Sequence, residues 1–277
     1  MKALIKRTTA FIILLATLGT VALSLSSCVS LEALVPNHMK PNLEGYELVF
    51  YDEFEGDSLD LSAWEYRGSG TRRGGFNHPD QVCVRDGNLV MTAEYTVSEY
   101  GEGWHTGMIR TIESYTQGYF EIRCLPNTGE DFWSAFWLTT IGVYDHDLSQ
   151  GGIGGAELDI FETYKNYSLT TEHFATSSVH CNGSDDVFEE IDSLRVSKTF
   201  VPNLRSEYHT FSMMWNEEEY IFYIDGIETG RTSFGKGVSQ VPEYVIVSLE
   251  INDEITVNRE STTEFLVDYV KIYQLKQ

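Results

Sequence analysis

Three carboxylic acids lie close together in a short segment rich in strand-forming residues. They are Glu157, Asp159 and Glu162, and they follow a glycine-rich stretch at residues 151–155. Successive side chains of a β-strand point to opposite faces, so Glu157 and Asp159 share a face, whereas Glu162 would point the other way. A β-bulge around residues 160–161 would add one residue and return Glu162 to the face of the other two acids. We therefore predict a bulged strand with all three carboxylates on one side.

This arrangement suits hydrolysis of a glycosidic bond with retention of configuration. That reaction uses two carboxyl groups about 5–5.5 Å apart, one as nucleophile and one as acid/base. Glu157 and Glu162 are the candidates for this pair. Asp159 between them would hold the nucleophile, while repulsion between like charges would raise the pKa of the acid/base. Taken alone, the spacing fits a solvated acidic edge of a very acidic protein equally well.

Motifs along most of the chain favour the catalytic interpretation. In chain order they are YDEFE at 51–55, DGNL at 86–89, GYFEIR at 118–123, FWSAFWL at 132–138, YIDG at 223–226 and VDYVKIY at 267–273. Together with the acid motif, this set resembles glycoside hydrolase family 16, the β-jelly-roll endo-glycanases. The resemblance extends from Leu48 to Tyr273. It implies that Glu157 is the nucleophile, that Asp159 assists it, and that Glu162 is the acid/base.

Further residues are predicted to bind the sugar. Alternation places Trp133 and Trp137 on one face of their strand, where an aromatic ring would pack against a pyranose. On the residues alone, two core tryptophans are the favoured interpretation. The resemblance favours binding for Trp137, which falls where relatives place an aromatic in the cleft. It also places His180 near the acid/base, to orient Glu162 or a substrate hydroxyl. The full predicted set is Trp137, Trp133, His180, Trp104, Asn77 and Glu250.

The predicted fold is all-β, a jelly-roll sandwich of two antiparallel sheets with a concave substrate cleft. Helical periodicity is nearly absent, and many short strands are separated by turn signals such as Asp86-Gly87. We expect a signal peptide at 1–27, a tether at 28–45 and one catalytic domain at 46–277. The domain is expected to be a monomer.

The N-terminus has the pattern of a lipoprotein signal. A positive segment with Lys2 and Lys6 precedes an uncharged apolar run at 11–25, and the sequence LSSC follows at 25–28. This pattern predicts cleavage before Cys28 and lipid attachment to it, although an ordinary cleaved signal peptide is the alternative. The prediction is an exported bacterial lipoprotein, anchored to a membrane at the cell surface or in the periplasm.

The formal charge of −23 excludes nucleic acid as a partner and favours a neutral polysaccharide. A local basic patch could override the overall field. Its candidate members are Arg67, Arg72, Arg73 and Arg85.

Metal sites and cysteines carry weaker signals. Cys83, Cys124 and Cys181 form no C-x-x-C pair, so a zinc site is unlikely. We prefer three buried thiols to one disulfide plus a free thiol. An Asp-His-Asp run at 145–147 is a weak metal alternative. The resemblance implies no catalytic cofactor. It does imply a structural calcium held by Asp268, a carbonyl near Gly87 and an acid near Glu53.

The substrate is the least determined feature. The E-x-D-x-x-E form resembles the family branch that acts on β-1,3-glucans and on galactans, and we favour a β-1,3- or β-1,3/1,4-glucan. Many β-1,3-glucanases carry a Trp-Pro pair before the acids, where this chain has Gly152-Ile153-Gly154. That departure keeps an endo-β-galactosidase acting on galactan or mucin-type glycans as an alternative. Two further alternatives for the function are a non-catalytic glycan-binding jelly roll and a transglycosylase.

Overall fold

The computed structural model describes residues 39–140, 152–163, 173–181, 193–235 and 237–277. Contacts divide the chain into two units, Met1–Lys40 and Pro41–Gln277, and the fold described below is that of the second. The predicted signal peptide, the lipidated Cys28 and the Asp-His-Asp run lie outside the described residues. Among the residues that are described, no helix is both long and apolar enough to cross a membrane.

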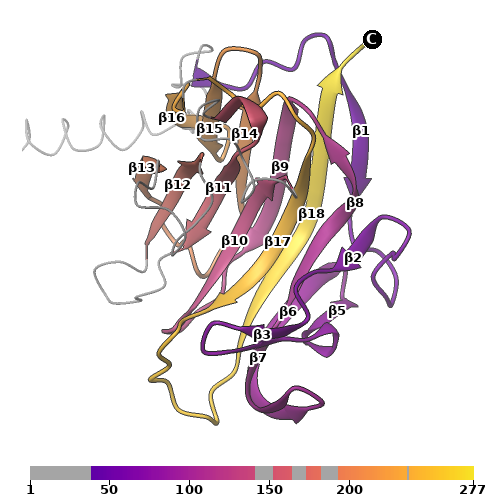
Figure 1. Cartoon of the computed structure of the whole chain (residues 1–277), viewed down its shortest axis with the longest axis vertical. Coiled ribbons are helices and arrows are strands. Elements are labelled where there is room, and N and C mark those ends of the chain that lie inside the picture. The colour runs from indigo at the N-terminus through magenta and orange to yellow at the C-terminus, as the bar shows by residue number, and fades with distance from the viewer. Residues whose placement is uncertain (1–38, 141–151, 164–172, 182–192, 236) are drawn as a thin grey trace, which may run out of the picture. The chain divides into compact units, whose positions relative to one another are not determined.

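Two sheets carry the described strands, and the predicted acids lie on the smaller one (Figure 1). In spatial order the smaller sheet contains β13 (Ser193–Phe200), β12 (Phe174–His180), β11 (Glu157–Thr163), β10 (Phe132–Thr139), β17 (Glu243–Ile251), β8 (Met108–Tyr115) and β2 (Trp64–Tyr66). All of its pairings are antiparallel.

The larger sheet has eleven described strands. In spatial order they are β16 (Ile227–Thr232), β15 (Tyr220–Ile224), β14 (His209–Trp215), β9 (Gly118–Leu125), β18 (Thr263–Leu275), β6 (Asn88–Ser98), β7 (Gly101–Thr106), β4 (Gly75–Asn77) and β3 (Gly70–Arg72), with β1 (Tyr46–Asp52) paired to β18 and β5 (Val82–Arg85) paired to β6. The short contact between β4 and β7 is parallel, and the other pairings are antiparallel. The predicted jelly-roll sandwich is confirmed.

The core lies between the two sheets and is rich in aromatic side chains. Phe161 of β11 stacks on Phe211 of β14, with ring centroids 4.0 Å apart. Both rings are fully buried, as are Phe136 and Phe265 beside them in the same cluster. Burial of each such ring contributes about 1.5–3 kcal/mol to folding stability. The apolar face of the strand that carries the acids therefore holds this strand against the core.

The hairpin predicted at Asp86-Gly87 forms. Asp86 and Gly87 have φ values of 52° and 69°, the left-handed pair of a type I′ turn, and Arg85 lies opposite Asn88 across it. Asp225 and Gly226 make the same kind of turn between β15 and β16, with φ values of 50° and 71°. Both turns twist in the direction that right-handed strands require.

The cysteine prediction holds for two residues out of three. Cys124 and Cys181 are buried and Cys83 is exposed, and all three are free thiols. The expectation of a buried Cys83 was wrong because its strand β5 lies at an edge, where alternate side chains face solvent.

The residues expected to hold calcium include a charged pair. Arg123 donates to the Asp268 carboxylate at 2.5 Å, so a guanidinium already supplies positive charge at that aspartate. Calcium prefers six to eight oxygen ligands, and one oxygen shared with an arginine fits it poorly. Calcium binding by Glu53, Gly87 and Asp268 stays a prediction.

Replacing Phe161 with alanine should lower the free energy of unfolding by about 3–5 kcal/mol, because it leaves a cavity against Phe211. Chemical denaturation monitored by fluorescence measures the change. Val97→Ala is the control, since Val97 is 72% exposed and its truncation should stay within about 0.5 kcal/mol. Equal denaturation midpoints for Phe161→Ala and wild type would show that this ring stack does not hold the sheets together.

Candidate active site

A β-bulge interrupts β11 where the sequence predicts it. Neighbouring residues of β10 lie opposite Asp159 and Phe161, so Ile160 has no partner on that strand. The pairing with β12 also shifts by one residue between Asp159 and Glu162. The hydroxyl of Ser177 donates to the carbonyl of Ile160 at 2.9 Å, which satisfies a backbone group that the bulge leaves outside the ladder.

The bulge sorts the side chains of β11 onto two faces. Leu158, Ile160 and Phe161 all belong to the core cluster. The opposite face carries Glu157, Asp159 and Glu162, and we call it the acid face. A separate apolar cluster from β8, β10 and β17 lines the acid face: Met108, Trp133, Ala135, Trp137 and Ile246. The sequence placed Trp133 and Trp137 on one side of β10, and the structure confirms this.

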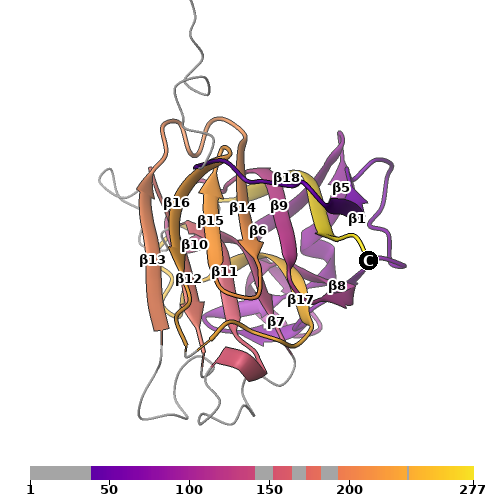
Figure 2. The ribbon, with the colours of Figure 1, turned by 90° about the horizontal axis from the view of Figure 1, so that it is seen from above.

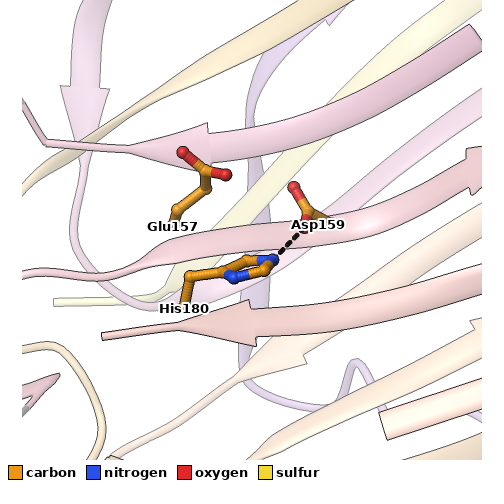
Figure 3. Close-up of side chains that lie close together, drawn as sticks. All are labelled: Glu157, Asp159 and His180. Atoms are coloured by element: carbon orange, nitrogen blue, oxygen red, sulfur yellow. Dashed lines mark hydrogen bonds and ion pairs between the residues drawn. The ribbon is translucent and has the colours of Figure 1, made fainter. Parts of the chain in front are cut away.

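His180 joins the first two acids (Figure 3). It lies on β12 directly opposite Glu157, and its Nε2 is 3.0 Å from the Asp159 Oδ2. Figure 3 shows the Glu157 and Asp159 carboxylates on one side of β11, with the imidazole reaching them from the next strand. His180 was expected to orient Glu162 or a sugar hydroxyl, and its observed partner is instead the carboxylate of Asp159.

Trp133 contacts the third acid. Its indole Nε1 donates to the Glu162 Oε1 at 2.9 Å. The donor comes from β10, where Ala135 is the direct neighbour of Glu162. Trp133 therefore fixes the direction of the Glu162 side chain, a role that differs from the predicted stacking on a sugar.

The two glutamates have raised pKa values for the same reasons. Burial raises the pKa of Glu157 most, and the charge of Asp159 adds to this, while His180 and Arg67 lower it. Burial and Asp159 likewise raise the pKa of Glu162, and the Trp133 hydrogen bond opposes them. Burial would lower the pKa of His180, but its hydrogen bond to Asp159 and the three nearby carboxylates raise it to about 9. His180 is therefore a cation at neutral pH.

Arginines cover both tryptophans of the acid face. The guanidinium of Arg67 lies 4.9 Å from the ring centroid of Trp137, and that of Arg73 lies 5.3 Å from the ring centroid of Trp133. Both rings are about 5% exposed as a result. Three of the four residues proposed as a basic patch reach this face. Arg85 does not, because it pairs with Glu264 on the larger sheet.

Glu250 is on the acid face but is already occupied. It lies opposite Trp133 on β17 and is 4% exposed. Arg72 donates to its Oε2 at 2.7 Å, and Arg73 approaches the same oxygen at 3.8 Å. Glu250 therefore anchors the arginines through Oε2, while its buried Oε1 has no hydrogen-bond partner, and its contact with sugar stays a prediction.

Two predicted sugar ligands are placed elsewhere. Trp104 packs edge-on against Phe132 in the core, with centroids 5.0 Å apart, so it is not on the acid face. Its strand, β7, belongs to the larger sheet, a position that sequence alternation cannot assign. Asn77 is 2% exposed and accepts a hydrogen bond from the Thr106 hydroxyl at 3.0 Å. This burial does not favour direct sugar contact by Trp104 or Asn77, which stays a prediction.

Glu243 is a site residue that the sequence analysis missed. It is fully buried at the start of β17, and its Oε1 accepts the backbone N–H of Ala156, the residue just before Glu157. Burial raises its pKa to about 8, and the charge of Glu157 contributes to the rise. The only signal in the sequence is an acid that begins a mostly apolar strand.

Among the described residues, one group of three acidic or histidine side chains is close enough to hold a metal ion. It consists of Glu157, Asp159 and His180, whose ligand atoms lie within 4.8 Å of one another. These are the same groups that glycoside hydrolysis would use. The charge of the His180 imidazolium already balances one carboxylate there.

Comparison with known proteins gives one family match. Residues 49–275 match the family described as "Beta-porphyranase A-D, GH16 domain". Endo-1,3-1,4-beta-glycanase EglC of Rhizobium meliloti is 29% identical over 202 residues, which cover 69% of this chain and 39% of that protein. Glucan endo-1,3-beta-glucosidase A1 of Niallia circulans is 24% identical over 278 residues, covering 84% of this chain and 39% of that protein. The chain thus spans about two-fifths of the length of these relatives.

Solved structures share the fold. Porphyranase B from Zobellia galactanivorans superposes with a TM-score of 0.67 at 19% identity, covering 88% of this chain and 98% of that one. The endo-beta-1,3(4)-glucanase SCLam gives 0.68 at 21% identity, with 86% and 93% covered. A structure described with endo-acting O-glycanases that initiate mucin breakdown gives 0.68 at 19%, with 86% and 94% covered. At these identities the likeness establishes the fold alone.

The buried carboxyl of Glu243 should make stability depend on pH. Its folded pKa is raised from 4.5 to about 8, so the folded protein keeps a proton that the unfolded chain releases. This contribution is complete below pH 4.5 and is lost as the pH rises toward 8. Glu243→Gln should therefore stabilise the fold relative to wild type by more than about 1 kcal/mol at the upper end of this window, and far less at the lower end.

Denaturant unfolding at both ends of the window measures this difference. Glu217→Gln is the matched control, because Glu217 is exposed in the turn before β15 and the same substitution there removes no buried carboxyl. A Glu243→Gln stability difference that does not change with pH would show that Glu243 is not protonated in the folded protein.

Proposed function

The chain belongs to glycoside hydrolase family 16, and from this membership we propose that it is a retaining endo-hydrolase that cleaves internal β-linkages of a polysaccharide. The observation that carries the proposal is the bulge in β11, which brings Glu157, Asp159 and Glu162 to one face. A solvated acidic edge would show these carboxylates exposed. Here Asp159 is 4% exposed and the two glutamates are half-buried.

Glu157 is the proposed nucleophile. Its pKa is raised to about 7, less far than the pKa of Glu162, which is raised to about 8, so Glu157 is the glutamate that loses its proton more readily. Its oxygen attacks the anomeric carbon, the glycosidic bond breaks, and a covalent glycosyl-enzyme forms. The hydrogen bond with His180 holds Asp159 next to Glu157 on the acid face.

Glu162 is the proposed acid/base. Its raised pKa keeps it protonated near neutral pH, so it can donate a proton to the leaving oxygen. Trp133 contacts its Oε1 and leaves the other carboxyl oxygen for this transfer. In the second step Glu162 accepts a proton from the water that releases the sugar from Glu157.

For the substrate we favour a β-1,3- or β-1,3/1,4-glucan. The support is that the relative at 24% identity is described as a glucan endo-1,3-beta-glucosidase and the relative at 29% identity as an endo-1,3-1,4-beta-glycanase. A β-galactoside polymer, such as porphyran or a mucin-type chain, is the second candidate. It is supported by the description of the matched family and by Arg67 and Arg73 against the tryptophans, which suit a substrate with acidic substituents.

Release of reducing ends tests the reaction. The domain is assayed on laminarin, barley β-glucan, agarose, porphyran, carrageenan and mucin-type oligosaccharides, beside Glu157→Ala. We expect cleavage of at least one polymer and a loss of more than about 10⁴-fold in the variant, which lacks the nucleophile. Circular dichroism controls for folding. Unchanged turnover by a folded Glu157→Ala would refute the assignment, and binding without cleavage by the wild type would favour a lectin-like protein.

The pH profile of kcat/KM should move in opposite directions in two variants. Asp159→Asn removes a charge that raises both glutamate pKa values, so both limbs of the bell should shift to lower pH. Trp133→Phe removes the hydrogen bond that lowers the pKa of Glu162, so its alkaline limb should shift to higher pH.

Trp133→Phe serves as the matched control for Asp159→Asn, since each changes one contact of the same carboxyl group. Shifts of the alkaline limb in the same direction in both variants would contradict the assignment of Glu162 as the acid/base.

A further inference from the structure

A second aromatic site lies on the acid face, two strands away from the tryptophans. On β12, alternate residues from His180 back to Phe174 share the acid face, because Ala175, Ser177 and Val179 point into the interior. Phe200 of β13 lies directly opposite Phe174. The two rings therefore stand together on the acid face at the end of the sheet, where β13 is the last strand (Figure 1).

These side chains form one connected group, which we call the edge platform: Phe174, Phe200, His173 and Lys198. Phe174 and Phe200 meet edge to face, with centroids 5.7 Å apart. The His173 ring also contacts Phe200, with centroids 5.4 Å apart. The Lys198 ammonium lies 4.8 Å from the Phe174 ring centroid. Phe200 is 57% exposed although its neighbours hold it in place.

Such a surface is unusual on an edge strand. An exposed large apolar side chain at a sheet edge invites pairing with other chains, and edge strands normally avoid it. On the reverse side, β13 lies near β16 of the larger sheet (Figure 2). The platform side is thus the one that β13 presents away from the core.

The platform is within reach of a glycan bound at the acids. Thr176 of β12 lies opposite Glu162, and Phe174 is two residues further along the same strand. Strand geometry then puts the Phe174 Cα about 8 Å from that of Glu162, and the Phe200 Cα about 12 Å away. Glu162 and the edge platform therefore lie on one continuous face of the smaller sheet.

We propose that the edge platform is a distal subsite that binds a further pyranose ring of the substrate chain. The exposed Phe200 ring would pack against the C–H face of the sugar, with Phe174 and His173 keeping the ring upright. Lys198 would contact a hydroxyl or a negatively charged substituent of the same sugar. The proposal rests on the proposed function, because its occupant is the polysaccharide that the acids cleave.

This subsite predicts a dependence on chain length. Phe200→Ala should lower kcat/KM about tenfold for octasaccharides and leave it unchanged for oligosaccharides too short to reach the platform. The probes are laminari-, agaro- and carrageenan oligosaccharides from disaccharides to octasaccharides. Lys198→Gln should weaken binding of the carrageenan series more than the neutral series if the lysine meets a sulfate, and of all series equally if it meets a hydroxyl.

The chain offers a matched control on its other sheet. Tyr51 is 43% exposed, stands beside Tyr269, and has the Lys271 ammonium 5.0 Å from its ring centroid. Tyr51→Ala thus removes an exposed aromatic of the same kind far from the acids. It should leave kcat/KM unchanged at every chain length.

Calorimetric binding to the Glu157→Gln protein separates this proposal from the proposed function. Weaker octasaccharide binding after Phe200→Ala supports the subsite even if the wild type cleaves nothing. Suppose that the wild type cleaves the oligosaccharides and that Phe200→Ala leaves kcat/KM unchanged, or lowers it by the same factor at every chain length. That result overturns the subsite and leaves the proposed hydrolase function standing. Absence of both cleavage and binding overturns both.

Discussion

The extra residue at Ile160 determines how the rest of the site is arranged. It lets Ile160 and Phe161 both face the core, and it turns Glu162 back to the side of Glu157 and Asp159. A strand without it would send Glu162 toward Phe211, where an unpaired carboxylate would cost several kcal/mol. The stacking of Phe161 on Phe211 and the Ser177 hydrogen bond hold the bulge, so core packing and acid placement are one constraint.

Around this bulge, each acid has a partner that defines its state. Asp159 is paired with a cationic His180, and Glu162 accepts a hydrogen bond from Trp133. The pKa of Glu157 is raised by the charge of Asp159 and lowered by that of Arg67. Three carboxylates in a partly buried site repel one another. The His180 imidazolium offsets part of this repulsion, and the pKa values of both glutamates are raised. The pKa of Glu162 is raised to about 8 and that of Glu157 to about 7, and this order suits a double displacement, which needs a protonated acid/base and an ionised nucleophile.

Much of this could be predicted from the sequence because it follows from alternation and turn chemistry. The bulge, the shared face of Trp133 and Trp137, and the Asp86-Gly87 hairpin are local patterns of this kind. The positions of Trp104 and Asn77 depend on tertiary contacts instead. Trp104 is in the core because β7 joins the larger sheet, and the buried Asn77 accepts a hydrogen bond from Thr106. Neither the His180 partner nor the Glu243 contact with Ala156 has a local signature.

The anomeric configuration of the first product tests the central claim most directly. Proton NMR during the earliest turnover of a β-linked substrate distinguishes the new reducing end before it equilibrates. If Glu157 and Glu162 act as nucleophile and acid/base from one face of the bulged strand, the β-anomer appears first and the α-anomer follows only by mutarotation. Initial release of the α-anomer would mean a single inverting displacement and would contradict these roles.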